Sequence, residues 1–76
     1  MKNITFLSDI QTLRRKRGWS QSKLASSLGI RRDELSILEN GHRLPNKDIL
    51  KKLTQELECL NRQLYPQEII NLIEEQ

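Results

Sequence analysis

The chain has 76 residues, a formal net charge of +3 and a hydrophobic content of 36%. This length allows one small domain, residues 1–76, near the limit of what a single hydrophobic core can hold together. A lone cysteine, Cys59, excludes an intramolecular disulfide or a multi-cysteine zinc site, and the lack of long apolar runs predicts a cytoplasmic protein.

The apolar pattern predicts an all-α domain of about five helices, with a glycine after each of the first three. The first predicted helix begins at Ser8, whose side chain has capping-box spacing with the glutamine three positions on, and it ends at Gly18. The second begins after Ser20, an N-cap residue, and ends at Gly29. The third follows that turn and ends at Gly41.

The C-terminal part, about residues 46–75, carries more apolar surface than a small domain obviously needs. Asn46 is predicted to cap a fourth helix that continues along leucines spaced by three and four, and Pro66 suits the first position of a fifth. We expect this part to form a homodimer, while the alternative is that the last helix folds back and completes the core of the monomer. The dimerisation candidates are Leu57, Leu60, Leu64, Ile69, Ile70 and Ile73.

Residues 20–40 have the features of two short helices joined by a tight turn, the helix-turn-helix unit. Ala25 is small enough for the two helices to approach closely, Gly29 gives the turn its backbone freedom, and Ile30 fills the space beneath it. Charge agrees with a polyanion partner, because residues 1–32 carry a net +7 and residues 33–76 a net −4.

The run LRRKRGWSQSKLASSLGIRRDELSILENGHRLP resembles the Xre/Cro-type helix-turn-helix regulators, which include the lambdoid phage repressors. The matching residues are Leu13-Arg14, Ser20-Gln21, Leu24-Ala25, Gly29-Ile30, Leu35, Leu38-Glu39, Gly41 and Pro45. The resemblance implies a lambda-repressor-like domain in which the second helix of the unit enters the major groove of DNA. It also implies that Arg14 and Glu39 pair and tie the first helix to the third.

By the same resemblance, the third predicted helix and its flanks contact DNA. The base-contacting candidates are Arg31, Arg32, Asp33, Ser36 and Ile37. The backbone-contacting candidates are Gln21, Asn40 and Arg43, of which Gln21 either touches a phosphate or orients a recognition side chain. Helical geometry independently places Asp33 and Ile37 nearly opposite the apolar face of their helix, where they meet solvent or a partner.

Arg31 departs from the family, which usually has Ser or Thr as the helix cap at this position. An arginine caps poorly and opposes the positive end of the helix dipole. A DNA phosphate or a guanine edge would compensate it, or else Asp33 and Glu34 already balance its charge. The chemistry of the groove suggests a half-site with G, C and T, read respectively by Arg32, Asp33 and Ile37.

We therefore expect a sequence-specific transcriptional regulator, a repressor that binds a palindromic operator in double-stranded DNA as a homodimer. No catalytic constellation or metal-ligand cluster is evident, so we expect no enzymatic activity, metal or cofactor. The alternative is a protein-interaction module, such as an antitoxin or adaptor, that binds a partner protein through Ile37 and Asp33 or through the C-terminal helices. The sequence does not distinguish a phage, restriction–modification or toxin–antitoxin system.

Overall fold

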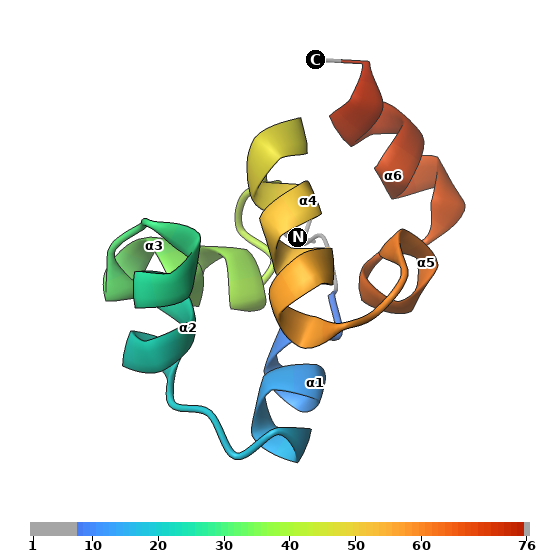
Figure 1. The fold of residues 1–76 in the computed structure, drawn as a ribbon. Coiled ribbons are helices and arrows are strands. Elements are labelled where there is room, and N and C mark those ends of the chain that lie inside the picture. Colours follow the sequence, from blue (N-terminus) through green and yellow to red (C-terminus); the bar gives the residue numbers. More distant parts are fainter. Residues whose placement is uncertain (1–7, 76) are drawn as a thin grey trace, which may run out of the picture.

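The computed structural model describes residues 8–75, which form six helices and no strand (Figure 1). The predicted all-α fold is confirmed, with one helix more than expected. The helices are α1 (Ile10–Lys16), α2 (Gln21–Leu28), α3 (Arg32–Glu39), α4 (Lys47–Leu57), α5 (Asn61–Leu64) and α6 (Gln67–Glu74). In Figure 1, α2 and α3 lie on one side of α4, and α5 and α6 on the other. None of the helices within residues 8–75 has the length and apolar character needed to cross a membrane.

The side-chain caps predicted at Ser20 and Asn46 form, whereas the one predicted at Ser8 does not. The Ser20 hydroxyl accepts from the backbone N–H of Lys23 at 3.0 Å, and the Asn46 side chain caps α4 in the same way. The predicted cap at Ser8 is wrong, because Asp9 occupies the N-cap position of α1 and makes no side-chain cap bond. The Ser8 hydroxyl is instead buried, and within residues 8–75 it forms no bond that caps α1.

The core is shared by the helix-turn-helix unit and the C-terminal helices. Leu24 and Leu35 are 0% exposed and pack in the same cluster as Leu53 and Ile73, from α4 and α6. The side chains of α6 therefore complete the core that holds α2 and α3 in place. Each fully buried leucine or isoleucine contributes about 1.5–3 kcal/mol by leaving water.

Most of the predicted dimer surface lies inside this monomer core. Leu57, Leu64, Ile70 and Ile73 are between 0% and 4% exposed, so their assignment to a dimer surface is wrong. A side chain enclosed by its own chain has no surface left for a second copy. Ile69 is half-buried against the core, and only Leu60 is well exposed, at 59%.

The predicted long fourth helix is also wrong, because α4 ends at Leu57. Glu58 follows with φ +53° and ψ +51°, the left-handed conformation that glycine usually supplies at a helix end. The backbone N–H of Cys59 donates to Thr54 at 3.0 Å and closes the last turn. The Glu58 carboxylate reaches back to Arg17 at 3.1 Å, in an exposed ion pair that joins the ends of α1 and α4.

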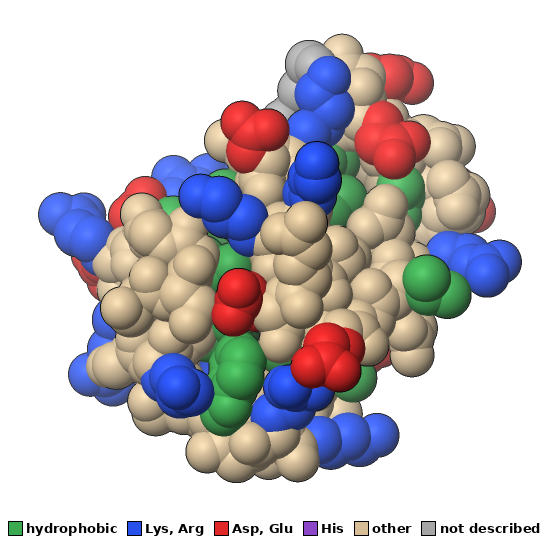
Figure 2. Space-filling model, viewed as in Figure 1, with side chains coloured by type: hydrophobic (Ala, Val, Ile, Leu, Met, Phe, Trp, Pro, Cys, Tyr) green, Lys and Arg blue, Asp and Glu red, His purple; other side chains and the backbone are tan. Residues whose placement is uncertain are grey.

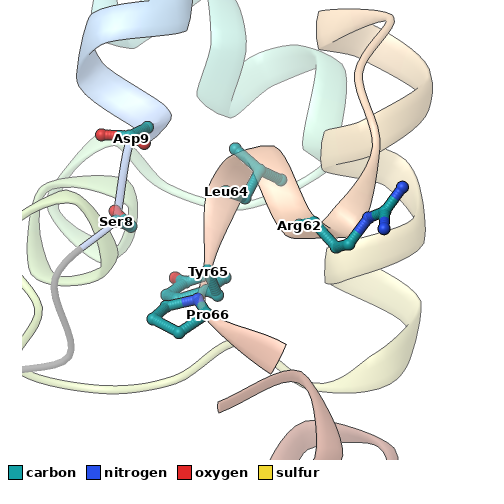
Figure 3. Close-up of a pocket in the computed structure, with 6 residues that line it drawn as sticks. All are labelled: Ser8, Asp9, Arg62, Leu64, Tyr65 and Pro66. Carbon is teal, nitrogen blue, oxygen red and sulfur yellow. The ribbon is translucent and has the colours of Figure 1, made fainter. Parts of the chain in front are cut away.

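A hollow of about 290 Å³ lies where the start of α1 meets α5 (Figure 3). The backbone N–H of Asp9 donates to the carbonyl of Leu64 at 3.2 Å, which ties these two parts together. Tyr65 is 1% exposed, and burial raises the pKa of its hydroxyl to about 12. In Figure 3, the Tyr65 ring extends toward the Ser8 side of the hollow, whereas Arg62 points away from it.

Candidate nucleic-acid interface

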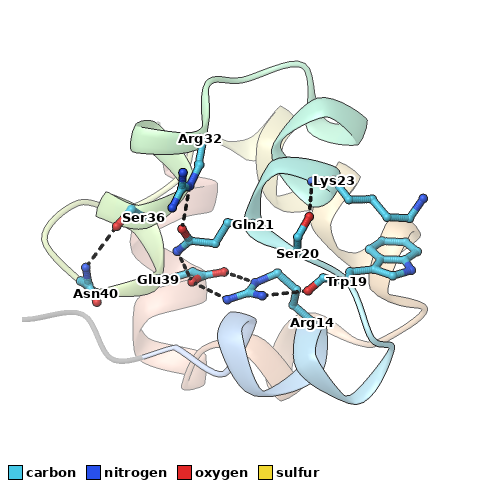
Figure 4. Close-up of polar contacts among 9 residues, drawn as sticks. All are labelled: Arg14, Trp19, Ser20, Gln21, Lys23, Arg32, Ser36, Glu39 and Asn40. Carbon is cyan, nitrogen blue, oxygen red and sulfur yellow. Dashed lines mark hydrogen bonds and ion pairs between the residues drawn. The ribbon is translucent and has the colours of Figure 1, made fainter.

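A buried ion pair between Arg14 and Glu39 fixes α3 against α1 (Figure 4). Arg14 Nε and Nη2 lie 2.6 and 3.2 Å from the two carboxylate oxygens of Glu39, and the side chains are 7% and 1% exposed. Arg14 Nη1 also donates to the carbonyl of Trp19 at 2.8 Å, which brings the loop before α2 into the same arrangement. This pairing of planar guanidinium and carboxylate defines a single relative placement of the two helices.

Gln21, the first residue of α2, connects the buried pair to the surface. Its Nε2 donates to Glu39 Oε1 at 2.8 Å, and its Oε1 accepts from Arg32 Nε at 3.4 Å. An ionised carboxylate can only accept hydrogen bonds, so the amide nitrogen of Gln21 must face Glu39 and its oxygen must face outward. This outward oxygen can accept a hydrogen bond, and Arg32 is the donor. The buried pair thereby orients an exposed arginine at the start of α3.

Arg31, the residue before α3, is compensated by its own neighbours. Its Nε lies 3.4 Å from Asp33 Oδ1 and 3.9 Å from Glu34 Oε1, and its backbone N–H donates to the Glu34 carboxylate at 3.0 Å. Asp33 also accepts from the backbone N–H of Glu34 at 3.1 Å. The two acids of the first turn therefore supply the compensation that would otherwise come from a DNA phosphate or a guanine edge.

The structure gathers most of the base-contacting candidates around one shallow hollow of about 380 Å³. Gln21, Arg32, Asp33 and Ser36 line it. Ile37 is half-buried but lies outside the group of apolar side chains that pack against the core. The outer face of α3 thus carries one apolar side chain among polar and charged ones, as the periodicity predicted.

The backbone-contacting candidates do not lie together. Gln21 is on the hollow at the start of α3, and Asn40, at its other end, donates to the Ser36 hydroxyl at 3.4 Å. Arg43 lines a separate groove beside Leu44 and Glu34, between α3 and the start of α4. Contact with DNA at all three positions would therefore extend along the whole length of α3.

Sequence reasoning counted Arg15 in the basic segment but did not name it among the residues that contact DNA. Arg15 is exposed and lines a hollow of about 340 Å³ with Ser20, Gln21 and Arg32, at the N-terminus of α2. The signal was the RRKR run, whose first arginine is buried and whose second faces this hollow. Figure 2 shows Lys and Arg side chains around the edge of the molecule where α1, α2 and α3 lie, with further ones over α4 and a strip of hydrophobic side chains between them.

Two further basic residues at this edge lie against the ring of Trp19. The Arg17 guanidinium and the Lys23 ammonium lie 5.0 and 5.2 Å from the centroid of its ring. Such cation–π contacts hold both cations beside the loop that leads into α2. The half-buried indole thus organises the basic surface as well as packing against the core.

Two short helices joined at a left-handed glycine, with the second helix exposed on a basic face, define a helix-turn-helix DNA-binding domain. A family model described as helix-turn-helix matches residues 10–59, and the chain belongs to this Xre/Cro-type family. It is therefore a DNA-binding transcriptional regulator and not an enzyme.

Solved structures agree with this assignment. The restriction-modification controller protein C.AhdI from Aeromonas hydrophila is 30% identical to this chain and superimposes with a TM-score of 0.65. The aligned region covers 71% of this chain and 82% of the C.AhdI chain. The hypothetical transcription factor NHTF from Neisseria is 29% identical, with coverage of 84% and 74% and a TM-score of 0.67. No curated protein matches the sequence.

The buried pair predicts a large difference between two adjacent arginines. Arg14→Ala leaves the Glu39 carboxylate buried and unpaired, so we expect the free energy of unfolding to fall by about 3–5 kcal/mol. Arg15→Ala, at an exposed position, should change it by less than about 0.5 kcal/mol. Urea unfolding followed by circular dichroism measures both, and an Arg14 variant already unfolded without urea agrees with the prediction. Equal losses for the two variants would contradict it.

Proposed function

We propose that this protein is a repressor that binds a palindromic operator as a homodimer, with α3 in the major groove. The observation that carries the proposal is the orientation of exposed Arg32 by Gln21, which is itself fixed by buried Glu39. A side chain held in place before binding loses less conformational entropy on contact, so it suits sequence reading. The basic edge formed by α1 to α3 supplies the attraction for phosphate.

We assign base contacts to the outer face of α3. Arg32 is suited to guanine through O6 and N7, and the apolar Ile37 to a thymine methyl group. Asp33 is suited to cytosine N4, with Arg31 and Ser36 as its neighbours at the groove. Asn40 and Arg43 are assigned to phosphates. The hydrogen bonds of Gln21 favour its role in orienting Arg32 over a phosphate contact.

The dimer would form on the C-terminal side of the molecule, away from α3 (Figure 1). Leu60 and Leu72 are 59% and 48% exposed, and they are the large apolar side chains left uncovered within residues 8–75. A two-fold dimer on this side would place two copies of α3 about 34–36 Å apart, on successive major grooves. Of the systems in which such small regulators occur, the likeness to C.AhdI supports a restriction–modification controller.

A second candidate function is binding of a partner protein through the outer face of α3. The observation that favours it is the exposed part of Ile37 beside acidic Asp33, since an acid in the groove is repelled by phosphates. The two functions differ in their response to salt and DNA.

Binding to fragments of the host genome at two salt concentrations tests the proposed function. Neutralised phosphates release counterions, so affinity should fall by about 10³–10⁵ between roughly 50 and 200 mM salt if six to ten phosphates are contacted. Filter binding or fluorescence anisotropy measures the fall. If no fragment is retained at the lower salt, the protein is not a repressor and the partner-protein function takes precedence.

Arg32→Ala and Gln21→Ala should relax the preference at the same base pair. Each removes or disorders one guanine contact, so we expect a loss of about 1–3 kcal/mol for the preferred sequence only. Arg43→Ala is the control, because loss of a phosphate contact weakens all sequences and reduces the salt slope by about 1. Binding to a randomised pool followed by sequencing distinguishes these patterns. A uniform loss with Arg32→Ala would make it a phosphate contact.

Leu60→Asp should convert the dimer into a folded monomer. The position is exposed in the single chain, so the charge disturbs the association and leaves the core intact. Gln55→Asp, at an exposed position on α4, adds the same charge and should leave the dimer unchanged. Sedimentation equilibrium measures the mass of each variant. A Leu60 variant of unchanged mass would place the interface elsewhere or exclude the dimer.

A further inference from the structure

Two adjacent arginines at the start of α3 have opposite surroundings. Arg31 Nε and Nη2 each lie 3.4 Å from an oxygen of the Asp33 carboxylate, and Nε lies 3.9 Å from Glu34. Among the residues that the structure describes, Arg32 has no carboxylate partner and donates instead to the neutral amide of Gln21. One guanidinium is therefore neutralised within the chain, while the other keeps its full charge for DNA.

The neutralised arginine is held only weakly. The side chains of Arg31 and Asp33 are 78% and 69% exposed, and such pairs contribute about 0–1 kcal/mol in water. Any phosphate that approached Arg31 would compete for it, and would also be repelled by Asp33. Because phosphates occur at every step of the duplex, an arginine without an acid would bind DNA of any sequence.

Asp33 has two separable properties. Its Oδ1 accepts from the backbone N–H of Glu34 at 3.1 Å, which supports the first turn of α3. Its negative charge acts on Arg31. An asparagine at this position keeps the acceptor oxygen but loses the charge, so a substitution can remove the second property alone.

We propose that Asp33 determines specificity by withholding Arg31 from phosphates in non-specific complexes. When α3 is seated on its preferred sequence, a base-edge donor satisfies the Asp33 carboxylate and Arg31 is released to contact DNA. Specificity is a difference between two affinities, and Asp33 raises it by weakening binding to the wrong sequences. The inference rests on the proposed function, because it requires that the outer face of α3 meets DNA.

A random-sequence duplex of about 20 base pairs is the probe, which requires no knowledge of the operator. Asp33→Asn should bind it about two- to fivefold more tightly at low salt, and should steepen the slope of log affinity against log salt by about 0.9, the effect of one added phosphate contact. Asp48→Asn is the matched control: it removes an exposed acid, in the first turn of α4, that is not one of the ion-pair partners of Arg31. It should leave the slope unchanged.

Arg31→Gln provides the second, independent measurement. Alone, it should neither strengthen binding to random duplex nor steepen the salt slope, because Asp33 keeps its charge and loses the cation that offsets it. Combined with Asp33→Asn, it should return affinity and slope to wild-type values. This cycle assigns the gain to Arg31 rather than to the general change in charge.

Three results would overturn the inference. If Asp33→Asn binds random duplex no differently from Asp48→Asn, Arg31 is not withheld. The inference is also overturned if Asp33→Asn weakens binding to the preferred sequence and leaves binding to random duplex unchanged, because Asp33 would then only contact a base. Failure of the wild-type protein to bind any DNA at low salt would instead remove the proposed function, and the inference with it.

Discussion

The position of α3 depends on the buried ion pair between Arg14 and Glu39. The pair joins α1 to α3 across 25 residues of sequence, and its further bonds to Trp19 and Gln21 include the loop and first turn of α2. A buried ion pair adds little net stability compared with apolar packing, yet removing one partner is severely destabilising. Its main effect is therefore geometric. Of the many ways in which three short helices could pack, it selects the one that presents the outer face of α3.

The orientation of the side chains is fixed less firmly with each step away from this pair. Glu39 is enclosed, Gln21 is half-buried and Arg32 is exposed, and each is oriented by the one before it. Arg31 lies outside this chain of contacts and is held only by surface carboxylates. The start of α3 thus combines a pre-oriented arginine with an exchangeable one. The first is suited to recognising a base, and the second responds to whatever charge surrounds it.

The local features of the fold were predictable from sequence, and the long-range ones were only partly so. Ser20 and Asn46 cap their helices as their residue types suggest, and the glycine after α2 adopts the expected left-handed conformation. The end of α4 was not predictable, because Glu58 adopts a glycine-like conformation and the leucine spacing continues past it. The burial of Leu57 also depends on how α6 folds back, which periodicity does not report.

In the candidate site, too, some contacts were predictable from the sequence and others were not. Family resemblance predicted the pairing of Arg14 with Glu39, and the spacing of Arg31 and Asp33 made their contact foreseeable. The bond between Gln21 and Glu39 was not foreseeable, because it joins residues 18 positions apart and requires one orientation of an amide. Sequence patterns identify which residues face outward. They do not specify which of those side chains are already committed to one another.

The closure of α5 onto the start of α1 has a consequence for how the chain is made. Asp9 bonds to Leu64, Tyr65 is enclosed beside Ser8, and Ile73 fills the core, so part of the final surroundings of the first helix comes from residues 64–73, far along the chain. Because a ribosome releases the N-terminus first, the helix-turn-helix unit emerges before the side chains that support it. The domain therefore completes its fold only when residues 64–73 have emerged, and a chain that stops before them lacks a closed core and is open to proteolysis.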